Sequence, residues 1–227
     1  MSDAFEEVEE NLRRDQYASW VRQYGLWALV ALALVLAGVG GWQAYQSWSA
    51  KQAGEYAEKL LGGQKLFQAH DLLGAERYYT DLSKSAPGVY KGAALQMVAE
   101  ALYEQGDMKN ALVRLDEAAN ATPDKFLKNA AKLKAAYIAA DLQDYKTVTP
   151  RLNELVEGGG SLGYQAREVL GAKAFEAGDL AKAREEYNFL SLALEAPEGV
   201  RQRARSALAL MGPAPTAAGA AAKTPAK

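Results

Sequence analysis

The uncharged stretch 23–50 constrains the fold of this chain more than any other feature, because its 28 residues include no Asp, Glu, Lys, Arg or His. A helix needs about 20 mostly apolar residues to cross the hydrocarbon core of a bilayer, and this stretch supplies them. Tryptophan and tyrosine flank its apolar centre on both sides, at Trp20, Tyr24, Trp27, Trp42, Tyr45 and Trp48. Such amphipathic rings collect at the two interfaces of a membrane. The stretch therefore predicts a single membrane-spanning helix in contact with the lipid bilayer.

Two other interpretations of this stretch stay open. It could be the central helix of a soluble core, although a buried helix has no need of tryptophans at both ends. It could also be a cleavable signal sequence with a cleavage region at 47–50. Signal sequences, however, have apolar runs of about 7–15 residues that end at a small-x-small site, and this run is longer and leads into bulky residues.

Small residues recur at every fourth position of the apolar stretch, at Ala33, Ala37 and Gly41. Ridges of this kind allow close packing against another membrane helix, so these three residues are candidates for such packing.

The composition excludes several kinds of site. The chain has no cysteine, so it has no disulfide, no thiolate metal site, no cysteine nucleophile and no lipid-modified cysteine. His70 is the only histidine, and no second histidine or cysteine exists to share a metal ion with it. We expect His70 to be an exposed residue in a turn, and Glu185 and Glu186 to belong to a solvated helix face. The sequence predicts no catalytic, metal-binding or cofactor-binding residue.

The charge on either side of the apolar stretch bears on its partners and its orientation. Three Arg and six acidic residues precede residue 23, whereas 23 basic and 22 acidic residues follow residue 50. Neither side is basic enough to bind nucleic acid. The basic residues next to the stretch are balanced, so they decide little about orientation. Because the small acidic segment 1–22 is easier to leave in the cytoplasm, we expect the larger segment to be translocated.

The segment after residue 50 is a series of degenerate repeats. Residues 92–123 have apolar residues at positions 4, 7 and 11 of the unit, alanine at positions 8, 20 and 27, a Gly-Asp turn and a final proline. This is the pattern of a tetratricopeptide helical hairpin of about 34 residues. The same frame fits units that begin at 56, 129 and 164, so the four starts are 36, 37 and 35 residues apart.

Stacked hairpins bury one another's apolar faces, and the last hairpin needs a capping helix. Residues 198–211 have the apolar stripe that such a cap requires. The sequence thus predicts an all-α chain with a cytoplasmic acidic tail at 1–22, a transmembrane helix with interfacial flanks at 23–50, and a repeat domain at 51–211. The last segment, 212–227, is rich in alanine and proline and is predicted to be disordered.

The first helix of each hairpin predicts a protein-binding surface. In a superhelix of helix pairs, positions 2, 5, 9 and 12 of these helices line the concave side. The candidate residues at these positions are Leu60, Phe67, Gln96, Tyr103, Leu133, Tyr137, Glu168 and Phe175. Spaced aromatic residues in a groove can hold a polypeptide by burying its apolar side chains. The alternative for each residue is packing between neighbouring repeats.

The acidic start MSDAFEEVEENLRRD, the apolar helix that ends in GWQAYQSW and the degenerate repeats together resemble the YfgM-like family of bacterial inner-membrane proteins. Members of that family are ancillary subunits of the SecYEG translocon. The resemblance implies a cytoplasmic N-terminus, a periplasmic repeat domain and no catalytic residues. It also implies three kinds of partner, namely Sec translocon subunits, a periplasmic chaperone and unfolded or translocating polypeptides. An envelope scaffold for cell division or cell-wall synthesis is the alternative, and self-association as a homo-oligomer stays open.

Overall fold

The computed structural model describes the backbone of residues 3–212 and the side chains of residues 27 and 29–212. Within residues 3–212 it contains nine α-helices and no strand, which confirms the predicted all-α fold. Their bounds are α1 Asp3–Gln68, α2 Leu72–Ser85, α3 Gly88–Glu104, α4 Met108–Ala121, α5 Lys125–Leu142, α6 Tyr145–Gly158, α7 Gly160–Glu176, α8 Leu180–Leu192 and α9 Glu198–Met211. The predicted disordered tail lies, apart from Gly212, outside the described residues.

The chain divides into two compact units, 1–56 and 57–227, and the division falls inside α1. The described part of α1 from Leu29 to Gln68 is long and apolar enough to span a membrane, and none of its apolar window is buried within the protein. A central helix of a soluble core would bury these side chains, so the structure disfavours that interpretation. The predicted boundaries after residues 22 and 50 coincide with no break in the helix.

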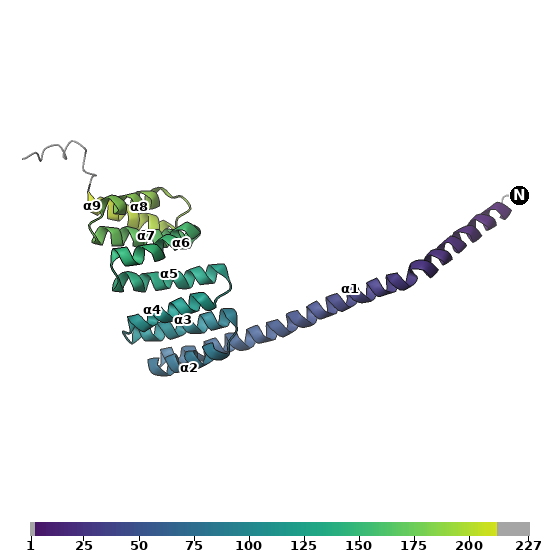
Figure 1. Cartoon of the computed structure of the whole chain (residues 1–227), viewed down its shortest axis with the longest axis horizontal. Coiled ribbons are helices and arrows are strands. Elements are labelled where there is room, and N and C mark those ends of the chain that lie inside the picture. The colour runs from purple at the N-terminus through teal and green to yellow at the C-terminus, as the bar shows by residue number, and fades with distance from the viewer. Residues whose placement is uncertain (1–2, 213–227) are drawn as a thin grey trace, which may run out of the picture. The chain divides into compact units, whose positions relative to one another are not determined.

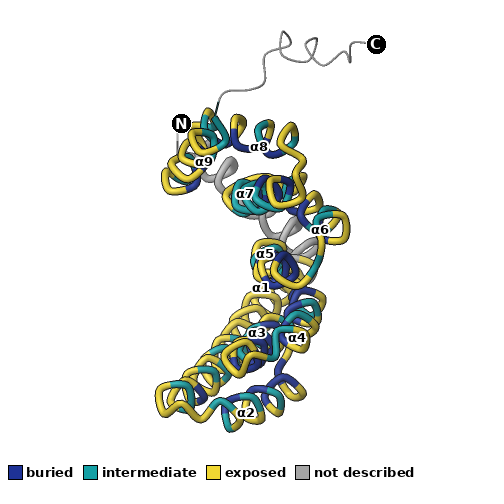
Figure 2. Tube along the Cα trace, turned by 90° about the vertical axis from the view of Figure 1, so that its left-hand side faces the viewer, coloured by how far each residue is buried: buried dark blue, intermediate teal, exposed yellow. Residues whose placement is uncertain are grey.

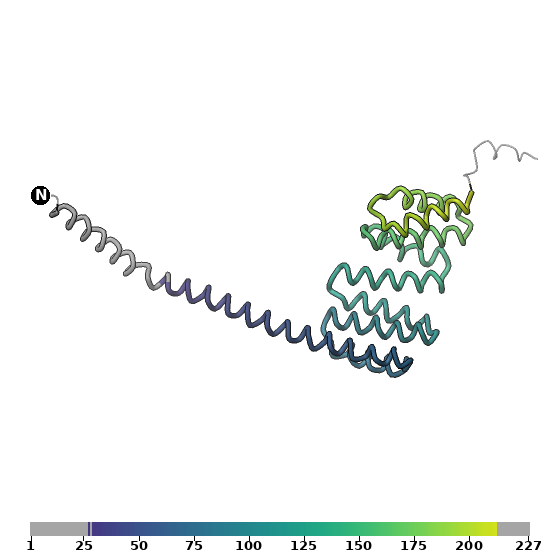
Figure 3. Tube along the Cα trace, turned by 180° about the vertical axis from the view of Figure 1, so that it is seen from behind, coloured from purple at the N-terminus to yellow at the C-terminus, as the bar shows by residue number. Residues whose placement is uncertain are grey.

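The second unit is a stack of helical hairpins. Residues 57–68 of α1 pair with α2. The following hairpins are α3 with α4, α5 with α6, and α7 with α8 (Figure 1). Helix α9 closes the stack over the predicted range, and the same order of helices is visible from behind in Figure 3. The helices of this unit follow an arc with α3, α5 and α7 nearer its inner side than α4 and α6 (Figure 2).

An aspartate begins the second helix of every hairpin. Asp71, Asp107, Asp144 and Asp179 each occupy position 16 of their unit and precede α2, α4, α6 and α8. Each carboxylate accepts a hydrogen bond from the backbone N–H three residues later, over 2.9 to 3.2 Å. Side chains in this position satisfy N–H groups that have no partner inside the helix. The four turns therefore use the same aspartate cap to begin the second helix.

The residue before the capping aspartate takes a left-handed backbone in three of the four turns. Gly106 and Gly178 have φ of 84° and 80°, where glycine is favoured because it lacks a Cβ atom. His70 occupies the same place with φ of 56° and is exposed, as predicted for a turn residue.

The contact between the two helices of a hairpin depends on matched residue sizes at positions 8 and 24. In the first and last hairpins these positions hold glycine and tyrosine, and in the two middle hairpins they hold alanine and leucine. A Cβ atom on Gly63 would lie 2.5 Å from the ring of Tyr79, and one on Gly171 would lie 3.2 Å from the ring of Tyr187. The large ring thus fits only where its partner has no side chain.

Candidate protein-binding groove

A shallow groove of about 250 Å³ lies between helices α3, α4 and α5. Its floor is apolar and consists of Ala99, Leu115 and Ile138, whose exposed fractions are 2%, 4% and 8%. Two tyrosines stand beside this floor, Tyr103 from α3 and Tyr137 from α5, with exposed fractions of 44% and 43%. The groove therefore combines a packed floor with two accessible aromatic rings.

Polar side chains complete the lining of this groove. They are Gln96, Glu100, Lys134 and Asp141. Apolar hollows with a few polar groups are the usual form of binding sites, and the polar groups fix the orientation of what is bound. This volume is comparable with that of one or two large side chains.

A second, more polar hollow of about 540 Å³ shares Tyr137 with the first and extends to α7 and α9. The guanidinium of Arg203 on α9 donates to both carboxylate oxygens of Glu168 on α7, over 2.5 and 2.8 Å. These hydrogen bonds and the charge of Glu168 raise the pKa of Arg203. Burial, followed by the nearby Glu168 carboxylate, raises the pKa of the Tyr137 hydroxyl, which therefore stays protonated and can donate a hydrogen bond.

The comparison with protein families covers both the apolar helix and the repeats. A model of the tetratricopeptide repeat-like domain matches residues 18–208. The chain belongs to this family. No curated protein and no solved structure matches the chain significantly.

The tetratricopeptide repeat-like frame brings together four of the eight predicted surface residues. Gln96, Tyr103 and Tyr137 line the first groove, and Tyr137 and Glu168 line the second.

The other four predicted surface residues are placed differently. Leu133 is 5% exposed and belongs to a buried cluster, and the half-buried ring of Phe67 lies 6.1 Å from that of Tyr79. Leu60 is half-buried and its carbonyl accepts a hydrogen bond from the Tyr79 hydroxyl. Phe175 is 48% exposed but lines neither hollow. In α1, Ala33, Ala37 and Gly41 are all exposed, and their role in helix packing stays a prediction.

Several lining residues were not among the predicted candidates. Glu100 occupies position 9 of its unit, which is one of the concave positions, so the repeat frame could have identified it. Lys134, Asp141 and Arg203 carry no comparable signal, because their contribution depends on how neighbouring hairpins and the cap pack.

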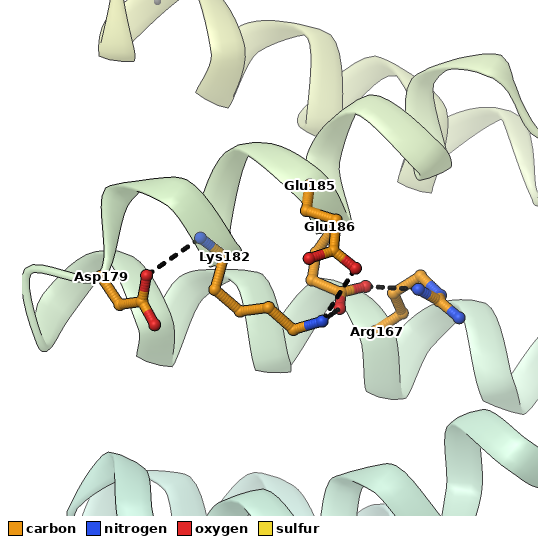
Figure 4. A network of polar contacts seen from close by, with 5 residues as sticks. All are labelled: Arg167, Asp179, Lys182, Glu185 and Glu186. Carbon is orange, nitrogen blue, oxygen red and sulfur yellow. Dashed lines mark hydrogen bonds and ion pairs between the residues drawn. The ribbon is translucent and has the colours of Figure 1, made fainter.

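A buried carboxylate inside the last hairpin of the tetratricopeptide repeat-like domain corrects one prediction. Glu186 was expected on a solvated face, but only 1% of it is exposed. Its carboxylate accepts from Arg167 of α7 over 2.5 Å and lies 2.7 Å from the ammonium nitrogen of Lys182 (Figure 4). The bond to Glu186, with a smaller contribution from Glu185, raises the pKa of Lys182.

Glu186 is buried because it lies on the side of α8 that packs against α7. The Arg167 guanidinium also lies 4.1 Å from the centre of the Phe189 ring, so α7 and α8 are joined by a cation–π contact as well as an ion pair. Among the described side chains, no group of three or more His, Asp or Glu residues could hold a metal ion. Arg167 and Glu186 are therefore best explained as structural partners.

Proposed function

We propose that the chain is a membrane-anchored adaptor that binds other proteins through the groove between α3 and α5. Tetratricopeptide repeat-like domains are generally non-catalytic modules for protein–protein interaction, and we propose that this chain is likewise not an enzyme and uses no cofactor. The observation that supports this proposal most directly is the pair of accessible rings, Tyr103 and Tyr137, over an apolar floor.

The binding step is the burial of an apolar side chain of the partner between the two rings. A fully buried leucine or phenylalanine side chain contributes roughly 1.5–3 kcal/mol. The Tyr137 hydroxyl and the polar groups of Gln96 and Lys134 can pair with the backbone of the bound segment, so that its peptide groups are not left without hydrogen bonds. Unfolded polypeptides expose both apolar side chains and backbone peptide groups.

The resemblance to the YfgM-like family supports a finer proposal. In it the chain is an accessory of the Sec translocon in a bacterial inner membrane, with its N-terminus in the cytoplasm and its repeat domain in the periplasm. The anchor is retained rather than cleaved, and it keeps the groove near newly translocated polypeptides or a periplasmic chaperone. One family model matches both the apolar helix and the repeats, which supports the proposal that the helix and the repeat domain act together.

Replacing both groove tyrosines should weaken partner binding without unfolding the repeats. We expect Tyr103→Ser with Tyr137→Ser to reduce affinity by at least about tenfold, because aromatic anchors contribute most of the binding energy of an interface. The measurement is co-purification with Sec translocon subunits from a mild detergent extract. Val113→Ser is the matched control, since Val113 is 51% exposed on α4 and lines neither hollow.

The identity of the recovered proteins separates the two functional proposals. Unchanged recovery of translocon subunits with the tyrosine variant would contradict binding through the groove. Recovery of septal or wall-synthesis proteins in their place would contradict the translocon proposal and support an envelope scaffold.

The orientation of the anchor has its own test, which uses the absence of cysteine. Cysteine is placed singly at Ser2 or at Lys227, and intact cells whose outer membrane has been permeabilised are treated with a membrane-impermeant thiol reagent. We expect labelling at Lys227 and none at Ser2 until the inner membrane is disrupted. The reverse pattern would overturn the periplasmic placement of the repeats and with it the translocon proposal.

A further inference from the structure

Two connections between hairpins form a surface that the binding groove does not use. They join α2 to α3 at 86–87 and α4 to α5 at 122–124, and the first turns of α3 and α5 that follow them contain the sequences Val-Tyr-Lys at 89–91 and Lys-Phe-Leu-Lys at 125–128. We call these seven residues the connection edge. The two connections lie side by side, because a Cβ atom on Gly88 would be 3.5 Å from the ring of Pro123.

Three apolar side chains of the connection edge face solvent. Phe126 is 65% exposed, and Leu127 and Val89 are 38% and 36% exposed. A large aromatic ring at such exposure, in the first turn of α5, contributes little to the packing of the repeats. Exposed apolar side chains that gather in one place often mark a site where another apolar surface binds and shields them from water.

The charge of the connection edge distinguishes between kinds of partner. Lys91, Lys125 and Lys128 flank the apolar residues in the sequence, and the acidic residue adjacent to them, Asp124, already accepts the backbone N–H of Leu127 over 2.8 Å. The connection from α8 to α9 also exposes a leucine, Leu194, but Glu195 lies beside it and Glu198 begins α9. Lysines beside exposed aromatic and aliphatic residues are typical of segments that lie on anionic bilayers.

The chain enters the repeat domain at the same edge. Tyr78 and Tyr79 of α2 donate hydrogen bonds to the carbonyl oxygens of Lys59 and Leu60, over 2.7 and 2.6 Å. Because only residues 69–71 join these two contacting helices, they form an antiparallel hairpin, and the end of α2 with the connection that follows it lies beside the start of 57–68. Six residues, 51–56, separate that start from the predicted membrane helix.

Residues 51–56 are a short tether between the predicted membrane helix and the repeat domain. Even fully extended, six residues span roughly 20 Å. A short tether makes a second contact with the same bilayer an intramolecular event at high effective concentration. A surface with only moderate affinity for lipid is then sufficient for a stable second contact with the bilayer.

We propose that the connection edge docks on the anionic surface of the bilayer that holds the anchor. The rings and aliphatic groups enter the boundary between headgroups and acyl chains, and the lysines contact lipid phosphates. This inference rests on the membrane anchorage in the proposed function, but it is independent of what the groove binds.

The test uses the full chain in lipid nanodiscs with a single environment-sensitive fluorophore on cysteine. Val89→Cys reports on the connection edge, and Val113→Cys is the matched exposed control on α4. Nitroxide-labelled lipids quench a fluorophore that touches the bilayer. We expect quenching and a blue-shifted emission at residue 89 with phosphatidylglycerol present, and neither at residue 113.

Changes to the rest of the connection edge should remove this signal. Each lysine near an anionic surface strengthens docking by roughly fivefold, so Lys125→Gln with Lys128→Gln should weaken it by roughly thirtyfold. Phe126→Ser should also weaken docking, both in nanodiscs that contain phosphatidylglycerol and in nanodiscs that lack it. Unchanged far-UV circular dichroism verifies that these exposed substitutions leave the helices intact.

Three outcomes would overturn the proposal. The first is equal quenching at residues 89 and 113 while a probe at Ala33→Cys is quenched, which would leave the anchor and the proposed function standing. The second is a blue shift at residue 89 without quenching by nitroxide lipids, which would indicate a second copy or another protein on this surface. The third is an unquenched probe at Ala33→Cys, which would overturn the anchorage as well.

Discussion

Replacing Glu186 with alanine should lower the free energy of unfolding of the repeat domain by about 3 kcal/mol. Removal of one partner of a buried ion pair leaves the other charge without compensation, and such changes cost roughly 3–5 kcal/mol. We place Glu186→Ala at the lower end, because the side chains of Arg167 and Lys182 are 21% and 34% exposed and water can reach them in part. Glu186→Gln should have a smaller effect, since the amide oxygen can still accept a hydrogen bond from Arg167.

The adjacent residue provides the control for this prediction. Glu185 has a side chain that is 65% exposed and forms an ion pair with the same lysine, over 3.0 Å. Exposed ion pairs contribute about 0–1 kcal/mol, so Glu185→Ala should change stability little. The change in the free energy of unfolding of each variant is to be measured by urea titration of the full chain in detergent, with far-UV circular dichroism as the signal. Equal effects of the two substitutions would contradict the structural role assigned to Glu186.

The second large effect is expected at Gly63, where an added methyl group has no room. Its Cβ atom would lie 2.5 Å from Tyr79 and 2.7 Å from Tyr78. Tyr79 cannot move aside readily, because it is 0% exposed and its ring packs edge-on against Tyr78 at 5.3 Å. Overpacking of this kind costs about 1–3 kcal/mol, so Gly63→Ala should destabilise the first hairpin by about that amount.

A double substitution tests whether matched size is the cause. The middle hairpins already pair alanine with leucine at these positions, so Tyr79→Leu should be less harmful in the Gly63→Ala background than in the wild type. A coupling free energy of about 1 kcal/mol or more, measured by thermal or urea unfolding of the four variants, would support this account. Additive effects would show that the two residues act independently. Tyr79→Phe separates the ring from the hydrogen bond to Leu60.

The repeat architecture could be predicted because each part of it depends on local spacing. The turns have an aspartate at position 16, the close helix contacts have small residues at position 8, and the cap has an apolar stripe over a single helix. These features act within one hairpin or one helix. The unbroken course of α1 through residues 51–56 was less apparent, since the change in composition there suggested a boundary while Gly54 alone is too weak a signal to end a helix.

The candidate site could be predicted only in part, because it depends on how successive hairpins are stacked. Tyr103 and Tyr137 were identified from positions 12 and 9 of their units, and both line the groove. Leu133 occupies another of the predicted concave positions, yet it faces the core. Glu186 was misassigned because two consecutive glutamates resemble a solvated face, and its partner Arg167 is on the preceding helix. The pairing of individual polar side chains on two helices, such as Arg167 with Glu186, carries no signal in the spacing of either helix alone.

The matched sizes at positions 8 and 24 also bear on how such an array can change by duplication or recombination. A single helix copied from an end hairpin into a middle one would place tyrosine against alanine or leucine against glycine, which produces a clash or a void. A complete hairpin carries both members of the pair and avoids either defect. The hairpin is therefore the smallest segment that can be inherited as an intact module, and a crossover is tolerated best in the connections between hairpins.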